Sequence, residues 1–314
     1  MSKSVVAIAK FVFSIGIVII LLLNSDLTTL AKTIVFSNYW YFILALIVLF
    51  VAMFAAVLRW RTLLARFGST PNNSDLFKVF CLSYFYNFFI PGGFAGDMIR
   101  GYKCKNFMLN ETKGLASVFM DRFIGLLSFA IFGIIGIIFI NDIFSQTELP
   151  ILVLMTPLIS IAGIIIFFNK KIMGLFKAIL ILHLPTYQKL KQLYDYIYYY
   201  KYYKRIVLQA LTISFFVTLC DVTSFYLLSH AIGCSIVFIN FLFLIPIITI
   251  VSYIPISYSG LGLREISFIL LFGQAGMTTD QALAVPIMYF GVMLILSIIS
   301  GTIFLISNKI DTYQ

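Results

Sequence analysis

The chain contains two interrupted apolar stretches, which read IPGGFAGDMIR at residues 90–100 and IPISYSGLGLR at residues 254–264. In both stretches Ile-Pro is followed by Gly five residues after the proline and by Arg nine residues after it, at a constant offset of 164 residues. Proline ends an incoming helix because it lacks the backbone N–H, and glycine allows the positive φ that a reversal needs. We therefore predict two broken helices, each with an incoming and an outgoing half.

The composition around these stretches is that of a membrane protein. Of the 314 residues, 61% are hydrophobic and 11% are charged, whereas a soluble domain carries roughly 25% charged residues. The mean hydropathy of +1.04 leaves too little polar material to cover a soluble globule. This excludes a soluble enzyme, a disordered chain and a disulfide scaffold. The net charge of +10 reflects the basic residues that membrane proteins gather on one side, so no nucleic-acid partner is expected.

Apolar runs of about 20 residues recur along the chain, which is the length a helix needs to cross a bilayer. We predict a single integral membrane domain over residues 1–314, all-α and polytopic, with about six spans plus two re-entrant broken helices. The predicted spans cover about 5–23, 39–58, 115–140, 149–168, 206–232 and 281–305, and the broken runs cover 76–90 and 236–273. The second span is expected to stop at Arg59 and Arg61. A connector at 170–205 is expected to hold a surface helix at 171–182 and a tyrosine-rich run at 194–203, which suits the headgroup layer or a headgroup-binding role.

The distribution of basic residues predicts the topology. If both termini are cytoplasmic, 20 of the 22 Lys and Arg residues lie on or near the cytoplasmic side, and the exceptions are Lys32 and Arg264. The predicted location is the plasma or inner membrane. Three spans separate the two broken runs, so the second enters from the opposite face. This is the inverted-repeat pattern of secondary transporters, with repeat 1 at about 39–168 and repeat 2 at about 206–305.

The two breaks are the first candidate site. The outgoing half-helices are expected to start near Gly96-Asp97 and near Gly262, where the first N–H groups lack partners within the helix. A helix start is also the positive end of the helix dipole and suits a phosphate. Arg100 and Arg264, one turn further on, would add guanidinium groups that fit phosphate oxygens. Asp97 is expected to cap its own helix. Alternatively, Arg100 simply marks the cytoplasmic boundary.

Ionisable residues in apolar surroundings extend this candidate site. Asp121 shares a helical face with small residues, so it is expected to point into the bundle and to pair with Arg100 or with groups near Arg122, in a structural or a site role. Asp221 lies near the middle of a predicted span and is expected to be a partner for Arg264 or a proton site. Glu265 offers Arg264 a closer charge partner.

Several of these motifs together resemble the membrane domain of the lysylphosphatidylglycerol synthase/flippase family over nearly the whole chain. They are the glycine-rich turn ending in Gly96-Asp97, the later Asp121-Arg122, and GLGLRE at residues 260–265 followed by QALA at 281–284. The family's best-known members flip an aminoacylated phospholipid between leaflets and carry an additional cytoplasmic synthase domain. The present sequence ends at Gln314 without one, so the resemblance implies the flippase half alone. The positions that match the family pattern are Gly96, Asp97, Arg100, Asp121, Arg122, Gly260, Gly262, Arg264 and Glu265.

The function expected from the sequence is a lipid translocase. Its substrate would be an anionic or aminoacylated phospholipid or an isoprenoid-phosphate-linked lipid, with the headgroup held between the two breaks. No enzymatic activity, cofactor or metal is expected, and close-packing glycines permit a homodimer. Two alternatives stay open: a membrane-embedded glycosyl or lipid transferase, and a non-transporting partner of an envelope biosynthesis complex. As a translocase, the protein is expected to lose transport on either Arg100→Ala or Arg264→Ala.

Overall fold

The computed structural model describes residues 16–17, 19–21, 23, 26–68, 71–90, 94–107, 110–139, 184–253 and 260–312. All regular elements within these ranges are helices. The predicted spans at 149–168 and, almost entirely, at 5–23 lie outside the described residues. So do the predicted surface helix at 171–182 and the two turns with Pro91 and Pro255.

Four described helices are long and apolar enough to cross a membrane, and they lie within Tyr39–Phe67, Glu111–Gly136, Lys204–Ala231 and Thr279–Ser307. These are α3 (Tyr39–Leu64) with the 3-10 turn η1 (Ala65–Phe67), α6 (Glu111–Phe139), α10 (Lys204–Ala231) and α13 (Thr279–Thr312). At 1.5 Å per residue the 26 residues of α3 reach about 39 Å, enough for the ~30 Å hydrocarbon core. The structure thus confirms a polytopic all-helical architecture.

Shorter helices complete the bundle. The chain order is α2 (Leu27–Val35), α3, α4 (Asn73–Phe89), α5 (Ala95–Lys103) with η2 (Cys104–Phe107), α6, α9 (Leu184–Tyr198) with η4 (Tyr199–Tyr202), α10, α11 (Phe238–Ser252), α12 (Leu263–Gln274) and α13. Each predicted break therefore separates two helices, α4 from α5 and α11 from α12. The same order of helices occurs twice, as α3–α6 and as α10–α13: a long helix and a shorter one precede the break, and a short helix and a long one follow it.

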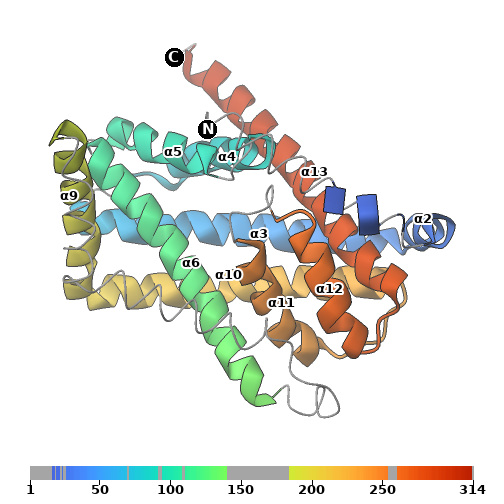
Figure 1. Cartoon of the computed structure of the whole chain (residues 1–314). Helices are drawn as coiled ribbons and strands as arrows, with labels where there is room; N and C mark the ends of the chain where they lie inside the picture. The colour runs from blue at the N-terminus through green and yellow to red at the C-terminus, as the bar shows by residue number, and fades with distance from the viewer. Residues whose placement is uncertain are drawn as a thin grey trace.

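The helices α3 and α10 lie side by side and run in opposite directions (Figure 1). At one end the N–H of Asn38 donates to the carbonyl of Ala231 over 2.8 Å. At the other end the Tyr200 hydroxyl donates to the carbonyl of Leu63 over 2.9 Å. The largest hydrophobic cluster packs between this pair and α11, α12 and α13, and two smaller clusters pack against the second half of α3.

One predicted boundary is wrong. The second span does not stop at Arg59 and Arg61, because α3 continues through both residues to Leu64. Arg59 is only 8% exposed, so it lies inside the bundle and does not mark the membrane surface. A buried guanidinium needs an opposite charge, and the structure supplies one from α6.

Candidate functional site

A buried network of charged side chains lies where α5 and α6 pack against α3. Nε of Arg59 donates to Oδ1 of Asp121 over 2.7 Å, and Nη2 of Arg100 lies 3.0 Å from the other oxygen, Oδ2, of Asp121. Arg100 also reaches Oδ1 of Asp97 at 3.4 Å. Both Arg100 and Asp121 are 1% exposed. Asp121 thus points into the bundle and pairs with Arg100, as the sequence predicted.

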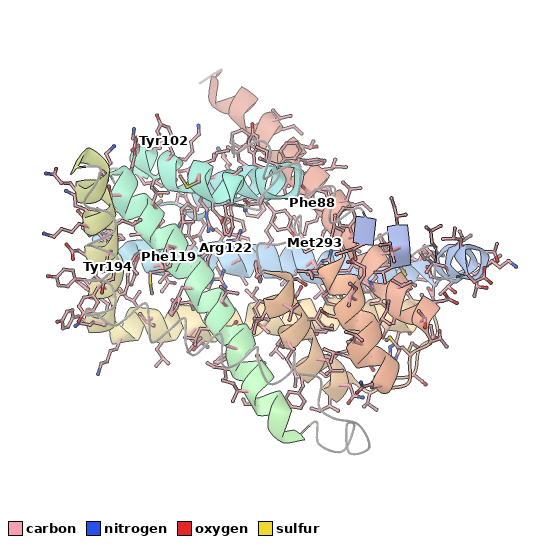
Figure 2. The ribbon with its side chains drawn as sticks, viewed as in Figure 1. Phe88, Tyr102, Phe119, Arg122, Tyr194 and Met293 are labelled. Carbon is pink, nitrogen blue, oxygen red and sulfur yellow. The ribbon has the colours of Figure 1, made fainter. Side chains whose placement is uncertain are left out.

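Arg122 completes the network at its more exposed side. Nε of Arg122 donates to Oδ2 of Asp97 over 2.7 Å, and Nη2 donates to Oδ1 over 3.1 Å. Such a two-bond arginine–carboxylate pair is geometrically specific. The Arg122 side chain keeps 37% of its surface exposed, and Figure 2 shows it on α6 at the centre of the molecule. The network therefore has one guanidinium at its surface and two in its interior.

Among the described residues three guanidinium groups share two carboxylates here, which leaves one positive charge uncompensated within that part of the chain. The remaining contacts of the interior arginines carry no charge: Nη1 of Arg59 donates to the Ser214 hydroxyl over 2.9 Å, and Arg100 lies over the rings of Trp60 and Phe80 at 4.8 and 4.9 Å. Aromatic faces stabilise a cation without neutralising it. The first break is therefore electropositive.

Asp97 does not cap its own helix, so that prediction is wrong. The residue preceding α5 has no side-chain cap, and the N–H of Gly96 instead donates to Oδ1 of Asn87, 2.9 Å away at the end of α4. Nδ2 of Asn87 donates to Asp97 over 3.3 Å. Asn87 ties the two halves of the broken helix together and shares Oδ1 of Asp97 with Arg100 and Arg122, whereas Oδ2 accepts from Arg122.

Glycines serve different purposes at the two breaks. Gly96 is helical, and a Cβ there would overlap the carbonyl oxygen of Ser83 on α4. Positive φ is predicted for the glycines of both breaks; it is confirmed at Gly260 (80°) and Gly262 (85°), and Gly92 and Gly93 of the first turn lie outside the described residues. Close approach of backbones explains the first glycine, and a turn that L side chains rarely adopt explains the other two.

The second break presents a looser set of charges. Oε2 of Glu265 accepts the N–H of Gly262 over 2.6 Å and so caps α12, and Oε1 of Glu265 lies 3.7 Å from Nε of Arg264. That Nε has no hydrogen-bond partner among the described residues, and the guanidinium lies 5.3 Å from the centre of the Tyr289 ring. Glu265 is thus the nearer partner of Arg264, as predicted, but its strongest contact is with the backbone.

Asp221 lies beside this second set. The Tyr289 hydroxyl donates to Oδ1 of Asp221 over 2.6 Å, and Arg264 interacts with the carboxyl electrostatically without an ion pair within 4.0 Å among the described residues. Tyr84 on α4 is in electrostatic range of Asp221, of Tyr253 at the end of α11, and of Arg122. The Tyr84 hydroxyl itself donates to Sδ of Met293 over 2.8 Å.

The starts of α5 and α12 do not offer all their amides to a ligand. At α5 the N–H groups of Gly96 and Met98 are already bonded, to Asn87 and to the carbonyl of Phe94. At α12 the N–H groups of Gly262 and Arg264 are bonded to Glu265 and to the carbonyl of Gly260. The predicted helix starts are confirmed at Ala95 and Leu263, but side-chain cations, more than free amides, give this site its positive charge.

Sequence reasoning missed Arg59, Asn87 and Ser214. Arg59 was assigned to the membrane surface because it follows an apolar run. Asn87 had a usable signal, since it is a lone amide four residues before Pro91 in an otherwise aromatic and aliphatic stretch. Ser214 had no signal, because a single serine in a membrane helix is common.

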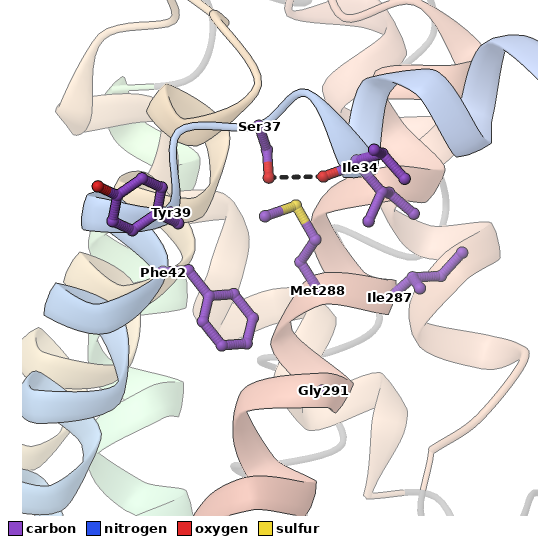
Figure 3. Close-up of a pocket in the computed structure, with 8 residues that line it drawn as sticks. Ile34, Ser37, Tyr39, Phe42, Ile287, Met288 and Gly291 are labelled. Carbon is purple, nitrogen blue, oxygen red and sulfur yellow. Dashed lines mark hydrogen bonds between the residues drawn. The ribbon is translucent and has the colours of Figure 1, made fainter.

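A cavity of about 410 Å³ lies apart from these charges, between α2, α3 and α13 (Figure 3). Its lining is mostly apolar, and Ser37 uses its hydroxyl to bond the carbonyl of Ile34 over 2.7 Å. This cavity contains none of the predicted site residues.

The fold and the site define a multi-pass helical membrane protein with an arginine–aspartate network at one helix break and an arginine–tyrosine–aspartate set at another. A family model, the lysylphosphatidylglycerol synthase TM region, matches residues 7–301. The chain therefore belongs to this family, as the resemblance of its motifs indicated. A comparison with curated proteins finds no significant match.

Proposed function

We propose that the protein is a lipid translocase that moves a phospholipid or isoprenoid-linked lipid with an anionic headgroup between leaflets of the cell membrane. The observation that carries this proposal is the uncompensated positive charge of the Arg59–Asp97–Arg100–Asp121–Arg122 network, with Arg122 at its exposed side. Membership of a family of lipid-related membrane proteins supports it.

Arg122 is the group best placed to take a lipid phosphate. Asp97 occupies two of the five N–H donors of a guanidinium, so donors remain for a phosphate oxygen. Arg100 is not available in this way, since Asp97 and Asp121 hold it in the interior. This revises the predicted roles: Arg100 positions the carboxylates, and Arg122 with Arg264 binds the headgroup.

Asp221 extends the proposal to aminoacylated lipids. Among the described residues its carboxyl receives one hydrogen bond, from Tyr289, and Tyr84 is within electrostatic range of both Asp221 and Arg122. An ammonium group on the headgroup would find its counter-charge at Asp221 while the phosphate stays at Arg122. A headgroup that carries both groups thus fits the two charge sets together.

The repeated order of helices supports an inverted repeat, α3–α6 against α10–α13, since the first members of the two halves run in opposite directions. Alternating exposure of the two breaks would then carry the headgroup across. Both termini would lie in the cytoplasm, in keeping with the excess of Lys and Arg in the loops on that side.

The test is lipid transport by the full chain reconstituted into phosphatidylcholine vesicles that contain fluorescent phosphatidylglycerol. Protection of the fluorophore from an external reductant reports the leaflet that it occupies. Arg122→Gln and Arg264→Gln should each slow transport about tenfold or more, the effect of losing one charged hydrogen bond to the moving group. The matched control is Arg61→Gln on α3, which should transport at the normal rate. Normal rates in both site variants, or a wild-type protein that moves none of the probe lipid, would overturn the proposal.

A further inference from the structure

The tyrosine-rich run at 194–203 takes no part in the proposed transport site, and it forms a distinct feature where α9 meets α10. In Figure 1, α9 lies across the end of the bundle, beside the end of α3 and the start of α10. Tyr200 is buried and bonds the carbonyl of Leu63. Phe67 packs edge-on against Tyr196 and Tyr200, at 5.6 and 6.0 Å between ring centres. Part of the tyrosine run is therefore a fixed contact with α3.

Three tyrosines at the end of the run face outward. Tyr202 is 66% exposed, and Tyr199 and Tyr203 are also exposed. Exposed tyrosines at the end of a spanning helix are typical of the level of the lipid headgroups, where the ring is buried and the hydroxyl is wet. This places the junction of η4 and α10 in the headgroup layer.

A cavity of about 290 Å³ opens at this junction, and its lining changes along its length. It is lined by Tyr200, Lys201 and Lys204 at one end and by Val207, Leu208 and Leu211 along α10. Leu208 is 65% exposed. The surface inside the groove is almost entirely apolar, which suits an acyl chain, and Lys201 and Lys204 at its headgroup end supply the positive charge that a lipid phosphate needs.

The cations of the groove are held in place and remain charged. Lys201 donates to the Tyr198 hydroxyl and lies over the rings of Tyr198 and Tyr202. The hydrogen bond to Tyr198 raises the pKa of the Lys201 ammonium, so it is protonated at neutral pH. The hydrogen bond and the ring contacts restrict the motion of the Lys201 side chain. Less side-chain entropy is therefore lost when an anion binds to it.

The positive charge at the start of α10 also favours a bound anion. Lys204 and Arg205 begin a helix of 28 residues, whose N-terminus carries the positive end of the helix dipole and has no side-chain cap. Cations at this end are unfavourable, and the described residues include no ion pair to either side chain. A phosphate beside Lys201 and Lys204 would relieve this accumulation of positive charge.

We propose that the groove at the junction of η4 and α10 binds one anionic phospholipid, with its phosphate at Lys201 and Lys204 and an acyl chain along Val207, Leu208 and Leu211. This site is separate from the Arg122–Arg264 site, and its lipid is a bound component that is not transported. Through Tyr200 and the Leu63 carbonyl, the bound lipid fixes the end of α3 against the start of α10.

The test is thermal unfolding of the full chain in a neutral detergent, titrated with dioleoylphosphatidylglycerol or with dioleoylphosphatidylcholine. The anionic lipid should raise Tm at lower concentrations than the neutral lipid does. In the double variant Lys201→Gln/Lys204→Gln, the concentration of the anionic lipid at half-effect should rise about thirtyfold, the loss expected for two interfacial cations.

The matched control is Lys189→Gln/Lys191→Gln, which removes the same charge from exposed positions on α9 and should keep the normal half-effect concentration. Equal weakening in both double variants would show attraction by net charge alone and would overturn the proposal. So would equal responses of the wild-type protein to the two lipids, or an equal response to free inorganic phosphate. The readout is independent of transport, so failure of the proposed translocase activity would leave this result intact.

Discussion

The two helix breaks share one sequence spacing and differ in how they hold their arginine. At the first break Arg100 is buried under Trp60 and Phe80 and pairs with two carboxylates. At the second break Arg264 has a single carboxylate at 3.7 Å and a ring face at 5.3 Å. The difference arises from α6, which brings Asp121 to Arg100, whereas α13 brings a tyrosine to Arg264. Two arginines at the same sequence spacing from a proline thus differ: a neighbouring helix supplies a carboxylate to Arg100, whereas the neighbouring helix at Arg264 supplies a tyrosine.

The largest difference between the breaks should appear in their acidic residues. Asp121→Asn leaves Arg59 and Arg100 buried without a full counter-charge, and we expect a loss of about 3–5 kcal/mol in unfolding free energy. Asp221→Asn keeps an acceptor for Tyr289, so it should cost less than about 1 kcal/mol. Denaturant titration of both variants in detergent micelles measures the two losses, and equal losses would remove the distinction drawn here.

A second difference concerns the glycines. Gly96→Ala forces a methyl group into the Ser83 carbonyl and should cost about 3 kcal/mol, because α4 and α5 must separate. Gly262→Ala should cost about 1–2 kcal/mol, from its positive φ and a contact of 2.8 Å to Ile17.

Denaturant titration in detergent micelles also measures the loss of unfolding free energy in Gly96→Ala and Gly262→Ala. Gly273, which has open space around its Cβ position, provides the control for a tolerated Gly→Ala change. The reverse order of cost would show that the positive-φ turn at Gly262 contributes more to stability than the close helix contact at Gly96, which would contradict this prediction.

Glu265 tests whether the second break depends on charge or on capping. Glu265→Gln keeps an oxygen for the Gly262 N–H and should cost less than about 1 kcal/mol, whereas Glu265→Ala removes the cap and should cost about 1–2 kcal/mol. A cost for Glu265→Gln as large as that for Glu265→Ala would instead identify the ion pair with Arg264 as the main contribution. The unfolding free energies of the wild-type protein, Glu265→Gln and Glu265→Ala distinguish capping from the ion pair.

The smallest effect is expected at Asp26, an exposed cap that serves as a reference for the buried cap of Glu265. Hydrogen bonds from Thr29 and Thr28 hold the pKa of Asp26 below its usual range. Its stabilisation of α2 is therefore present above the unfolded-state pKa of about 3.9 and is lost as pH falls through the lower folded-state value. The Tm of the wild-type protein should therefore fall between neutral and acidic pH by an amount that Asp26→Asn does not show. The measurement is Tm against pH for both proteins, and coinciding profiles would contradict the prediction.

Much of the fold could be predicted from the sequence, because long apolar runs and Pro-Gly interruptions are local signals. The helices α6, α10 and α13 begin and end within a few residues of the expected positions, apart from the C-terminal extension of α13 to Thr312. The partners of the charges could not be predicted in the same way. Asp121 finds Arg59 at a separation of 62 residues, and no local pattern encodes that pairing. For Asp121 the sequence left two pairings open, with Arg100 or with groups near Arg122, and the structure shows the pair with Arg100.

The position of Arg59 has a consequence for any motion of this molecule. Its guanidinium binds α6 through Asp121 and α10 through Ser214 while its backbone belongs to α3. One side chain thus fastens three long helices, two from the first half of the chain and one from the second. If the protein works as the proposed translocase, each cycle either breaks the bonds of Arg59 to Asp121 and Ser214 or moves α3, α6 and α10 together.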